Sequence, residues 1–238
     1  MGQSEEILNH VRCKMEDGRC GDPDSDKVLG SELWKKDERL FLYRNLQTYE
    51  MDCAFKRRGE PMKLVFSGML GVAQDVAGIV KNVPWKELGV EFHILGGGKQ
   101  YDEIVAWCEE HPDSGVFAHG FVPKEEIAGR LTSMDASIVP LATRIRGAFP
   151  SKVFDILPQG LPILFCGGGE GAKFISQREV GFTSAPGNYA ALIENIKRLR
   201  DMSEEDYEAM SARCIAVSKQ ELDFDRQMGE CYEWLLKV

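Results

Sequence analysis

The 238-residue sequence lacks several features that would assign it to a class of protein at once. No apolar run approaches the roughly 20 residues that a helix needs to cross a bilayer. The N-terminus shows no basic segment followed by an apolar one. We therefore expect a cytoplasmic protein with at most peripheral membrane contact, reached through a partner at the inner face of the membrane. A net charge of −9 and a pI near 5.1 leave no broad basic surface, which argues against nucleic-acid binding.

Disulfide and metal frameworks are missing as well. The seven cysteines are scattered and include no Cys-x-x-Cys pair, so we interpret them as free thiols. The four histidines show no metal-ligand spacing. We expect no metal site and no cofactor apart from a bound substrate.

The triple glycine at 96–98 does not complete either of two familiar nucleotide motifs. Gln100 stands where a Walker loop has Ser or Thr, and Tyr101 stands where a dinucleotide fingerprint has its third glycine. Two interpretations remain open: a strand-to-helix turn that borders a ligand crevice, or a purely structural turn.

Short β-branched runs alternate with helical patterns from residue 63 onward, which is typical of βα units around a parallel sheet. The predicted strands span 64–67, 91–95, 116–119, 136–140, 162–166 and 181–183, and helices are predicted to begin near 74, 100, 124, 151, 171 and 188. Two further amphipathic helices, from Ser203 and near Phe224, are expected to bury their apolar faces in the core. We predict an α/β fold with a Rossmann-like parallel sheet flanked by helices, and ligands at the carboxyl ends of its strands.

One stretch, 147–172, combines a helix start, a buried strand and a glycine turn, directly after a basic loop. Ser151 is predicted to cap the helix and to leave its first N–H groups and positive dipole end free to face a phosphate. Lys152, with Arg144 and Arg146, adds positive charge to the interval between Asp135 and Asp155, which contains no Asp or Glu. The stretch therefore predicts an anion-binding crevice, in which these three cations would stabilise developing negative charge; solvated loop arginines are the alternative.

The order Pro-Ser-Lys-hydrophobic-Phe-acid, followed by Gly-x-Pro-hydrophobic and Gly-Glu-Gly-Ala, resembles the donor-binding half of bacterial family 4 glycosyltransferases of the GT-B fold. Enzymes of this kind build capsular and cell-wall polysaccharides. Matching stretches lie at 63–74, 92–98, 119–126 and 137–141, so that the resemblance covers roughly the last three quarters of the chain. It implies a retaining, metal-independent transfer of sugar from a nucleotide sugar, expected to be UDP-linked, to a glycan or lipid-linked acceptor.

The resemblance also implies roles for individual residues. Asp155 takes the place of the second Glu in the family's "Glu, seven residues, Glu" signature, which binds the donor ribose; a solvated helix residue is the alternative. Gly147 replaces the first Glu, which removes a group expected to touch the sugar. The loop at 71–75 holds no cation, although many family members carry Arg and Lys there.

Further donor contacts are expected from loops that follow the strands. Phe121 and Val122 match the loop that lines the base, unless Phe121 packs under that loop. Glu170 is expected to reach donor hydroxyls or to cap the helix that follows. Three glycines are expected where the backbone approaches the donor: Gly68, Gly71 and Gly98.

The first sixty residues read differently, with a helix start at Ser4 and a strand at 39–45. By the resemblance, we expect residues 1–47 to be a helix-strand remnant of the N-terminal, acceptor-binding domain, 48–62 a linker, and 63–238 the donor-binding domain. Such a chain would bind donor but turn over slowly or not at all without an acceptor-domain protein partner. Two alternatives remain: a sugar-nucleotide epimerase of the same fold, or a non-catalytic binding or scaffold module.

Overall fold

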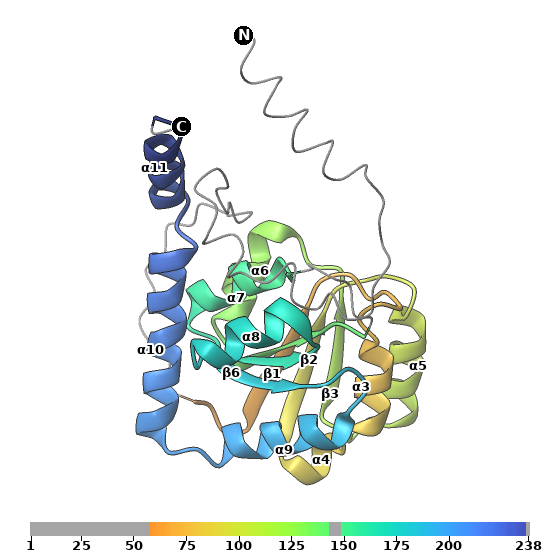
Figure 1. The fold of residues 1–238 in the computed structure, drawn as a ribbon. Helices are drawn as coiled ribbons and strands as arrows, with labels where there is room; N and C mark the ends of the chain where they lie inside the picture. Colours follow the sequence, from red (N-terminus) through yellow and green to blue (C-terminus); the bar gives the residue numbers. More distant parts are fainter. Residues whose placement is uncertain (1–57, 143–148, 237–238) are drawn as a thin grey trace, which may run out of the picture. The chain divides into compact units, whose positions relative to one another are not determined.

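The computed structural model describes residues 58–142 and 149–236. Within them, six parallel strands form one open sheet in the order β3-β2-β1-β4-β5-β6 (Figure 1). This is the Rossmann order, and it confirms the predicted fold class. The strands are β1 (Met62–Ser67), β2 (Val90–Leu95), β3 (Val116–Gly120), β4 (Ala136–Pro140), β5 (Ile163–Cys166) and β6 (Gly181–Ser184). Each predicted strand is present to within two residues of its expected bounds.

Helices connect the strands and close the described chain. They are α3 (Val76–Asn82), α4 (Trp85–Leu88), α5 (Tyr101–Glu110), α6 (Lys124–Leu131), α7 (Lys152–Ile156) with the 3-10 turn η2 (Leu157–Gln159), α8 (Gly169–Gln177), α9 (Tyr189–Arg200), α10 (Glu204–Glu221) and α11 (Phe224–Leu235). The short helix α4 was not predicted. Its four residues, between Pro84 and a left-handed Gly89, are too few to show a helical period.

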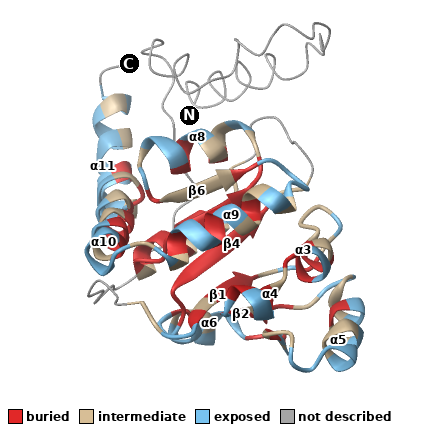
Figure 2. Ribbon diagram, turned by 90° about the horizontal axis from the view of Figure 1, so that it is seen from below, coloured by how far each residue is buried: buried red, intermediate tan, exposed pale blue. Residues whose placement is uncertain are grey.

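The two faces of the sheet bury separate hydrophobic cores. Helices α3, α4, α5 and α9 pack on one face, where the rings of Trp85 and Phe92 stack with centroids 4.5 Å apart. Helices α6, α7 and α8 pack on the other, together with Cys214 of α10. Figure 2 shows the central strand β4 buried between these layers. The sheet is therefore covered on both sides, as a parallel sheet requires, and its strand ends are left for function.

The two C-terminal helices differ in how far they are buried. The predicted apolar stripe of α10 is buried at Tyr207, Met210 and Cys214. The same expectation is wrong for α11, where Met228 is 42% and Leu235 54% exposed. Helix α11 continues beyond the sheet at the end of α10 (Figure 1), so its apolar side does not reach either core.

A buried carboxylate fixes the chain at the amino end of β1. The side chain of Asp135 accepts hydrogen bonds from the backbone N–H groups of Gly59 (2.9 Å) and Lys63 (2.6 Å). The Tyr207 hydroxyl donates to the Asp135 carbonyl at 2.7 Å. Arg58 donates to two carbonyl groups at the α9–α10 junction, both at 2.9 Å. The segment that leads into β1 is thus tied to β4, α9 and α10.

Candidate functional site

The candidate site lies at the carboxyl ends of β1 and β4. These strands are neighbours in the sheet, and the chain proceeds outward from them in opposite directions, to β2 and β3 on one side and to β5 and β6 on the other. Such a reversal leaves a crevice between the loops that follow the two strands, where ligands bind in open α/β sheets. The loop after β4 includes residues 143–148, so Arg144, Arg146 and Gly147 lie outside the described residues.

Lys152 extends from the start of α7 across the end of β1. Its Nζ lies 5.4 Å from the centroid of the Phe66 ring, and a Cβ built on Gly68 would come within 2.6 Å of the same nitrogen. Gly68 (φ +133°) therefore leaves the space that the lysine occupies. Burial lowers the pKa of Lys152, and the nearby Asp155 carboxylate partly opposes this effect.

The ammonium group of Lys152 makes neither a hydrogen bond nor an ion pair to any residue of the described ranges. A half-buried cation without an acceptor is unfavourable, because it has lost part of its hydration without a replacement. The arrangement is suited to an anion that enters the crevice. Lys152 therefore lies at the carboxyl end of the sheet, which is the end where the sequence predicted a ligand.

The loops after β1, β2 and β3 are joined through their backbones. Gly68 N–H donates to the Leu95 carbonyl (2.8 Å), Leu70 N–H to Gly97 (2.9 Å), and Gly96 N–H to Gly120 (2.7 Å). A Cβ on Gly96 would overlap the Gly68 carbonyl. Gly96 thus has a structural reason to lack a side chain, and these contacts hold the three loops together at the carboxyl end of the sheet.

The other two predicted glycines both belong to the contacts of the loop after β1, and for Gly98 a neighbour explains the small size. A Cβ on Gly98 would lie 2.6 Å from the Leu70 carbonyl oxygen. The Gly71 carbonyl accepts from Gln74 N–H at 3.1 Å, which closes the turn before α3. Both residues shape the loop after β1, and a direct role in donor binding stays a prediction.

The predicted cap at Ser151 is wrong. Ser151 occupies the N-cap position of α7, but its side chain makes no capping hydrogen bond, and its backbone is already helical (φ −58°, ψ −24°). A capping serine needs an extended backbone to reach the amides of the first turn. Helix α7 also has only five residues, so its dipole is small. Among the described residues, Lys152 supplies the positive charge predicted for this end of the sheet, and a role of the helix start in binding an anion stays a prediction.

The other predicted contacts fall around the same strand ends. Phe121, directly after β3, is 81% exposed, so the alternative that it packs under its loop is wrong. Val122 is buried in the core, which leaves only its backbone for a ligand. Glu170 lies inside the first turn of α8 and not at its N-cap, which excludes the capping alternative. Asp155 lies one turn after Lys152 on α7.

A hydrogen-bonded pair between α3 and α9 was not predicted. The Tyr189 hydroxyl donates to the Asp75 carboxylate at 2.7 Å, and Asp75 also accepts from Gly78 N–H at 3.3 Å. Burial, followed by the interaction with Asp75, raises the pKa of Tyr189 to about 12. The spacing Asp75-x-x-Gly78 is an N-cap signal that could have revealed half of this pair.

Histidines form a second cluster, on β2 and β3. His93 Nδ1 lies 2.9 Å from His119 Nε2, and His93 Nε2 lies 3.1 Å from the Glu91 carboxylate. His93 is therefore satisfied within the sheet. Within residues 58–142 and 149–236, no group of three His, Cys, Asp or Glu side chains is placed to hold a metal ion. None of the helices in these ranges could span a bilayer.

Comparison with known proteins points in one direction. The family model described as "Glycosyl transferases group 1" matches residues 62–201. A structure of a mutant of S. aureus TarM, in complex with fondaparinux, α-GlcNAc-glycerol and UDP, aligns with a TM-score of 0.67 at 13% identity, over 84% of this chain and 40% of TarM. The pneumococcal O-GlcNAc transferase GtfA, in complex with UDP and GlcNAc, aligns with a TM-score of 0.61 at 14% identity, over 79% and 38%.

A third similar structure is shorter. The catalytic domain of the cholesterol-α-glucosyltransferase from Helicobacter pylori aligns with a TM-score of 0.53 at 16% identity, over 66% of this chain and 97% of that domain. At these identities the likeness is one of fold. The chain spans about 40% of the length of TarM. No curated protein matches the sequence.

Proposed function

This chain belongs to the group 1 glycosyl transferases, and from that premise we propose that it is the donor-binding half of a glycosyltransferase. The diphosphate of a nucleotide sugar would lie between the carboxyl ends of β1 and β4, against Lys152. The sugar would pass to a glycan or lipid-linked acceptor in polysaccharide biosynthesis. The reaction would be retaining and metal-independent.

The observation that carries this proposal is the state of Lys152. Its ammonium is half-buried at the point where the strand order reverses, and it has no acceptor within the described residues. A diphosphate oxygen would complete its hydrogen bonds with a charge-assisted contact. The same contact strengthens as charge accumulates on the departing diphosphate, which is how a fixed cation lowers the barrier of such a transfer. Arg144 and Arg146 would add to this effect.

The nucleotide is proposed from two sources. Phe121 offers an exposed ring at the end of β3, two strands from β1, where a base could stack. The TarM and GtfA structures each contain UDP. We therefore propose a UDP-linked donor, with Asp155 near the ribose and Glu170 near the sugar hydroxyls.

The acceptor side of the reaction requires more protein than the described fold supplies. This chain spans about 40% of TarM and 38% of GtfA. Catalysis depends on holding donor and acceptor together in one cleft. We propose that the isolated chain binds donor but turns over slowly until an acceptor-binding domain joins it.

Calorimetric titration of the full chain with UDP, GDP and ADP tests the proposal. Lys152→Met keeps the length of the side chain but removes its charge, and we expect the affinity for UDP to fall about 10- to 100-fold, which corresponds to the loss of one charge-assisted hydrogen bond. Lys219→Met, on the exposed side of α10, is the matched control and should bind like the parent.

The outcomes separate the candidate functions. An unchanged affinity in Lys152→Met would refute the assignment of the site. The absence of saturable binding for all three nucleotides would favour a scaffold module. Sugar products formed from UDP-sugars without an acceptor would favour an epimerase.

A further inference from the structure

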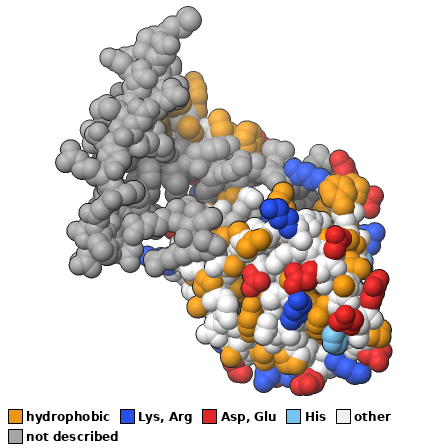
Figure 3. Space-filling model, turned by 90° about the vertical axis from the view of Figure 1, so that its right-hand side faces the viewer, with side chains coloured by type: hydrophobic (Ala, Val, Ile, Leu, Met, Phe, Trp, Pro, Cys, Tyr) orange, Lys and Arg blue, Asp and Glu red, His pale blue; other side chains and the backbone are white. Residues whose placement is uncertain are grey.

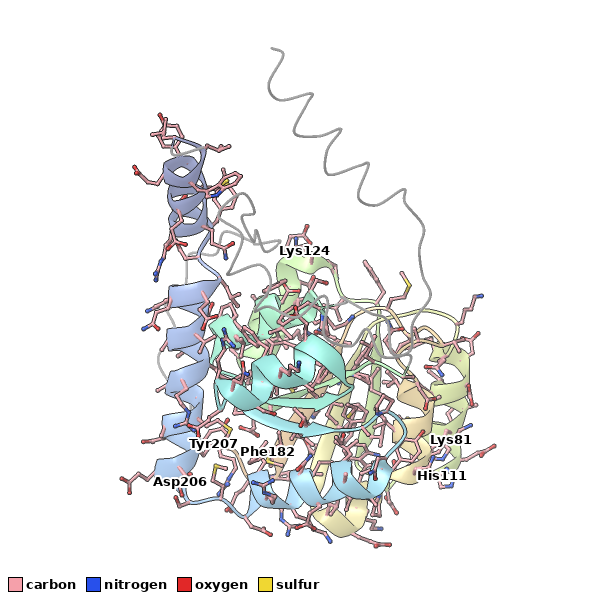
Figure 4. All side chains as sticks on the ribbon, viewed as in Figure 1. Lys81, His111, Lys124, Phe182, Asp206 and Tyr207 are labelled. Carbon is pink, nitrogen blue, oxygen red and sulfur yellow. The ribbon has the colours of Figure 1, made fainter. Side chains whose placement is uncertain are left out.

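A second concavity lies at the opposite end of the sheet from Lys152. It is formed by the end of α3, helix α4, the end of α5 and the turn that leads into β3, and its volume is about 470 Å³. In Figure 4, Lys81 and His111 mark this amino end, whereas Lys124 marks the carboxyl end. Pockets that hold small ligands commonly measure roughly 300–1,000 Å³. We call this concavity the amino-end pocket.

The walls of the amino-end pocket are apolar and aromatic. Pro84 and Pro112 line it together with Trp107 and His111. The two rings stack with centroids 4.4 Å apart and planes 16° from parallel, and His111 Nδ1 lies 2.9 Å from the Trp107 carbonyl oxygen. His111 is exposed, so its ring presents a flat surface whose orientation is already fixed.

The rim of the pocket carries both signs of charge in equal number. Lys81 and Lys86 oppose Glu87 and Asp113. The Lys86 and Asp113 side chains are 71% and 88% exposed, and their charged atoms lie 3.9 Å apart. The face shown in Figure 3 likewise mixes acidic, basic and hydrophobic side chains. A balanced rim gives no net attraction for an anion such as a nucleotide, or for a cation.

Hydrogen-bonding groups remain available next to the apolar walls. The Asn82 amide nitrogen donates to the Gly78 carbonyl at 2.8 Å, which leaves its oxygen as an acceptor at the pocket. A ligand that matches the apolar walls, the balanced rim and the Asn82 acceptor must be uncharged, must have a flat apolar face, and must carry hydroxyl groups around its edge. A pyranose ring has these properties.

We infer that the amino-end pocket is a binding site for a neutral sugar unit of a glycan, about one strand length away from the donor crevice. Six residues of β2 separate the two ends, which corresponds to roughly 20 Å. A glycan chain held there would remain attached to the protein while the donor crevice exchanged its nucleotide. The inference does not depend on the proposed donor site.

Nuclear magnetic resonance of the full chain tests this inference. The probes are four neutral oligosaccharides: maltohexaose, cellohexaose, laminarihexaose and tetra-N-acetylchitotetraose. The reporter is the indole N–H of Trp107, assigned with Trp107→Phe. We expect at least one probe to shift this resonance saturably, and His111→Ala to weaken that binding about tenfold, because the stacking surface is lost.

Three variants make the result specific. Asn82→Ala should weaken the same binding with an unchanged fold, so the test does not depend on His111→Ala alone. Tyr232→Ala removes an aromatic side chain that is 62% exposed on α11 and should bind like the parent. Lys152→Met should leave oligosaccharide binding intact while UDP binding falls.

Three outcomes would overturn the inference. They are the absence of saturable shifts with all four probes, binding that His111→Ala and Asn82→Ala leave unchanged, and preferential binding of the anionic tetragalacturonate. Loss of sugar binding in Lys152→Met would assign the sugar to the donor crevice instead. UDP titration is read independently, so failure of one site is distinguishable from failure of the other.

Discussion

Two charged side chains lie at opposite ends of the central strands β1 and β4. Asp135, at the amino end, has its hydrogen-bond partners within the described chain, and Lys152, at the carboxyl end, does not. Asp135 is 5% exposed and accepts from Gly59 and Lys63 N–H groups. Lys152, at the carboxyl end, has a nearby ring and a glycine but no acceptor within the described residues. A buried charge that is satisfied by the fold serves stability, whereas a half-buried charge that is left unsatisfied points to a ligand.

The first and largest test removes the satisfied charge, the carboxylate of Asp135. Asp135→Ala removes the acceptor for two backbone N–H groups, and we expect it to lower the free energy of unfolding by about 2–4 kcal/mol. Urea denaturation measures this change. Asp113→Ala, at an 88% exposed position, is the control and should change stability by less than about 0.5 kcal/mol. If both substitutions lowered the free energy of unfolding equally, the hydrogen bonds of Asp135 would contribute no more to stability than an exposed aspartate does.

The second test displaces Lys152 without changing it. Gly68→Ala adds a methyl group where the lysine side chain lies, at a backbone angle (φ +133°) that alanine rarely adopts. We expect a loss of about 1–3 kcal/mol in stability and weaker UDP binding. Gly97→Ala is the matched control, since a Cβ there meets no atom within 4 Å. Normal UDP affinity in Gly68→Ala would mean that the position of the lysine over β1 is not required.

The third test concerns the cost of holding Lys152 half-buried without an acceptor in the described ranges. Burial lowers the pKa of Lys152 below its ordinary 10.5, so the unfolded chain holds this proton more tightly than the folded one. The contribution of Lys152 to stability should therefore rise with pH between the lowered pKa and 10.5, and Lys152→Met should lose that rise. At neutral pH we expect Lys152→Met to be slightly more stable than the parent. Urea midpoints from pH 7 to 10 provide the measurement, and a less stable Lys152→Met would contradict the argument.

The residues at the two ends of the strands also differ in how well their roles could be predicted from the sequence. The six strands were predictable because short β-branched runs alternate with helical patterns, and four of these runs end at glycines such as Gly68 and Gly120. Lys152 was predicted as a phosphate contact, but nothing in the sequence indicates that it lies over Gly68, because the contact joins distant segments. Asp135 was not singled out, since its partners are backbone N–H groups, which almost every residue possesses.

Where short-range rules were applied alone, two predictions were wrong. The serine before a helix predicted a cap at Ser151, but the turn that begins at Pro150 already sets a helical backbone there. The period of α11 was identified correctly, yet a period does not say what covers the apolar side, and Met228 and Leu235 are exposed. The amino-end pocket was not predicted either, because Trp107 and His111 fit a helix stripe as well as a binding surface.

The smallest expected effect on stability comes from the pair of His93 and His119. Like Asp135, this pair is a polar cluster whose partners lie within the sheet. Burial, and then the charges of His93 and Arg130, lower the pKa of His119 below its ordinary 6.5. The unfolded state then binds the proton more tightly, so stability should fall as the pH drops from 6.5 through the lowered value. We expect the parent to lose less than about 1 kcal/mol between pH 7.5 and 5, relative to His119→Gln. His111→Gln, a substitution outside the pair, should show the same pH dependence of stability as the parent. If satisfied groups serve the fold alone, the parent and both variants should bind UDP with the same affinity.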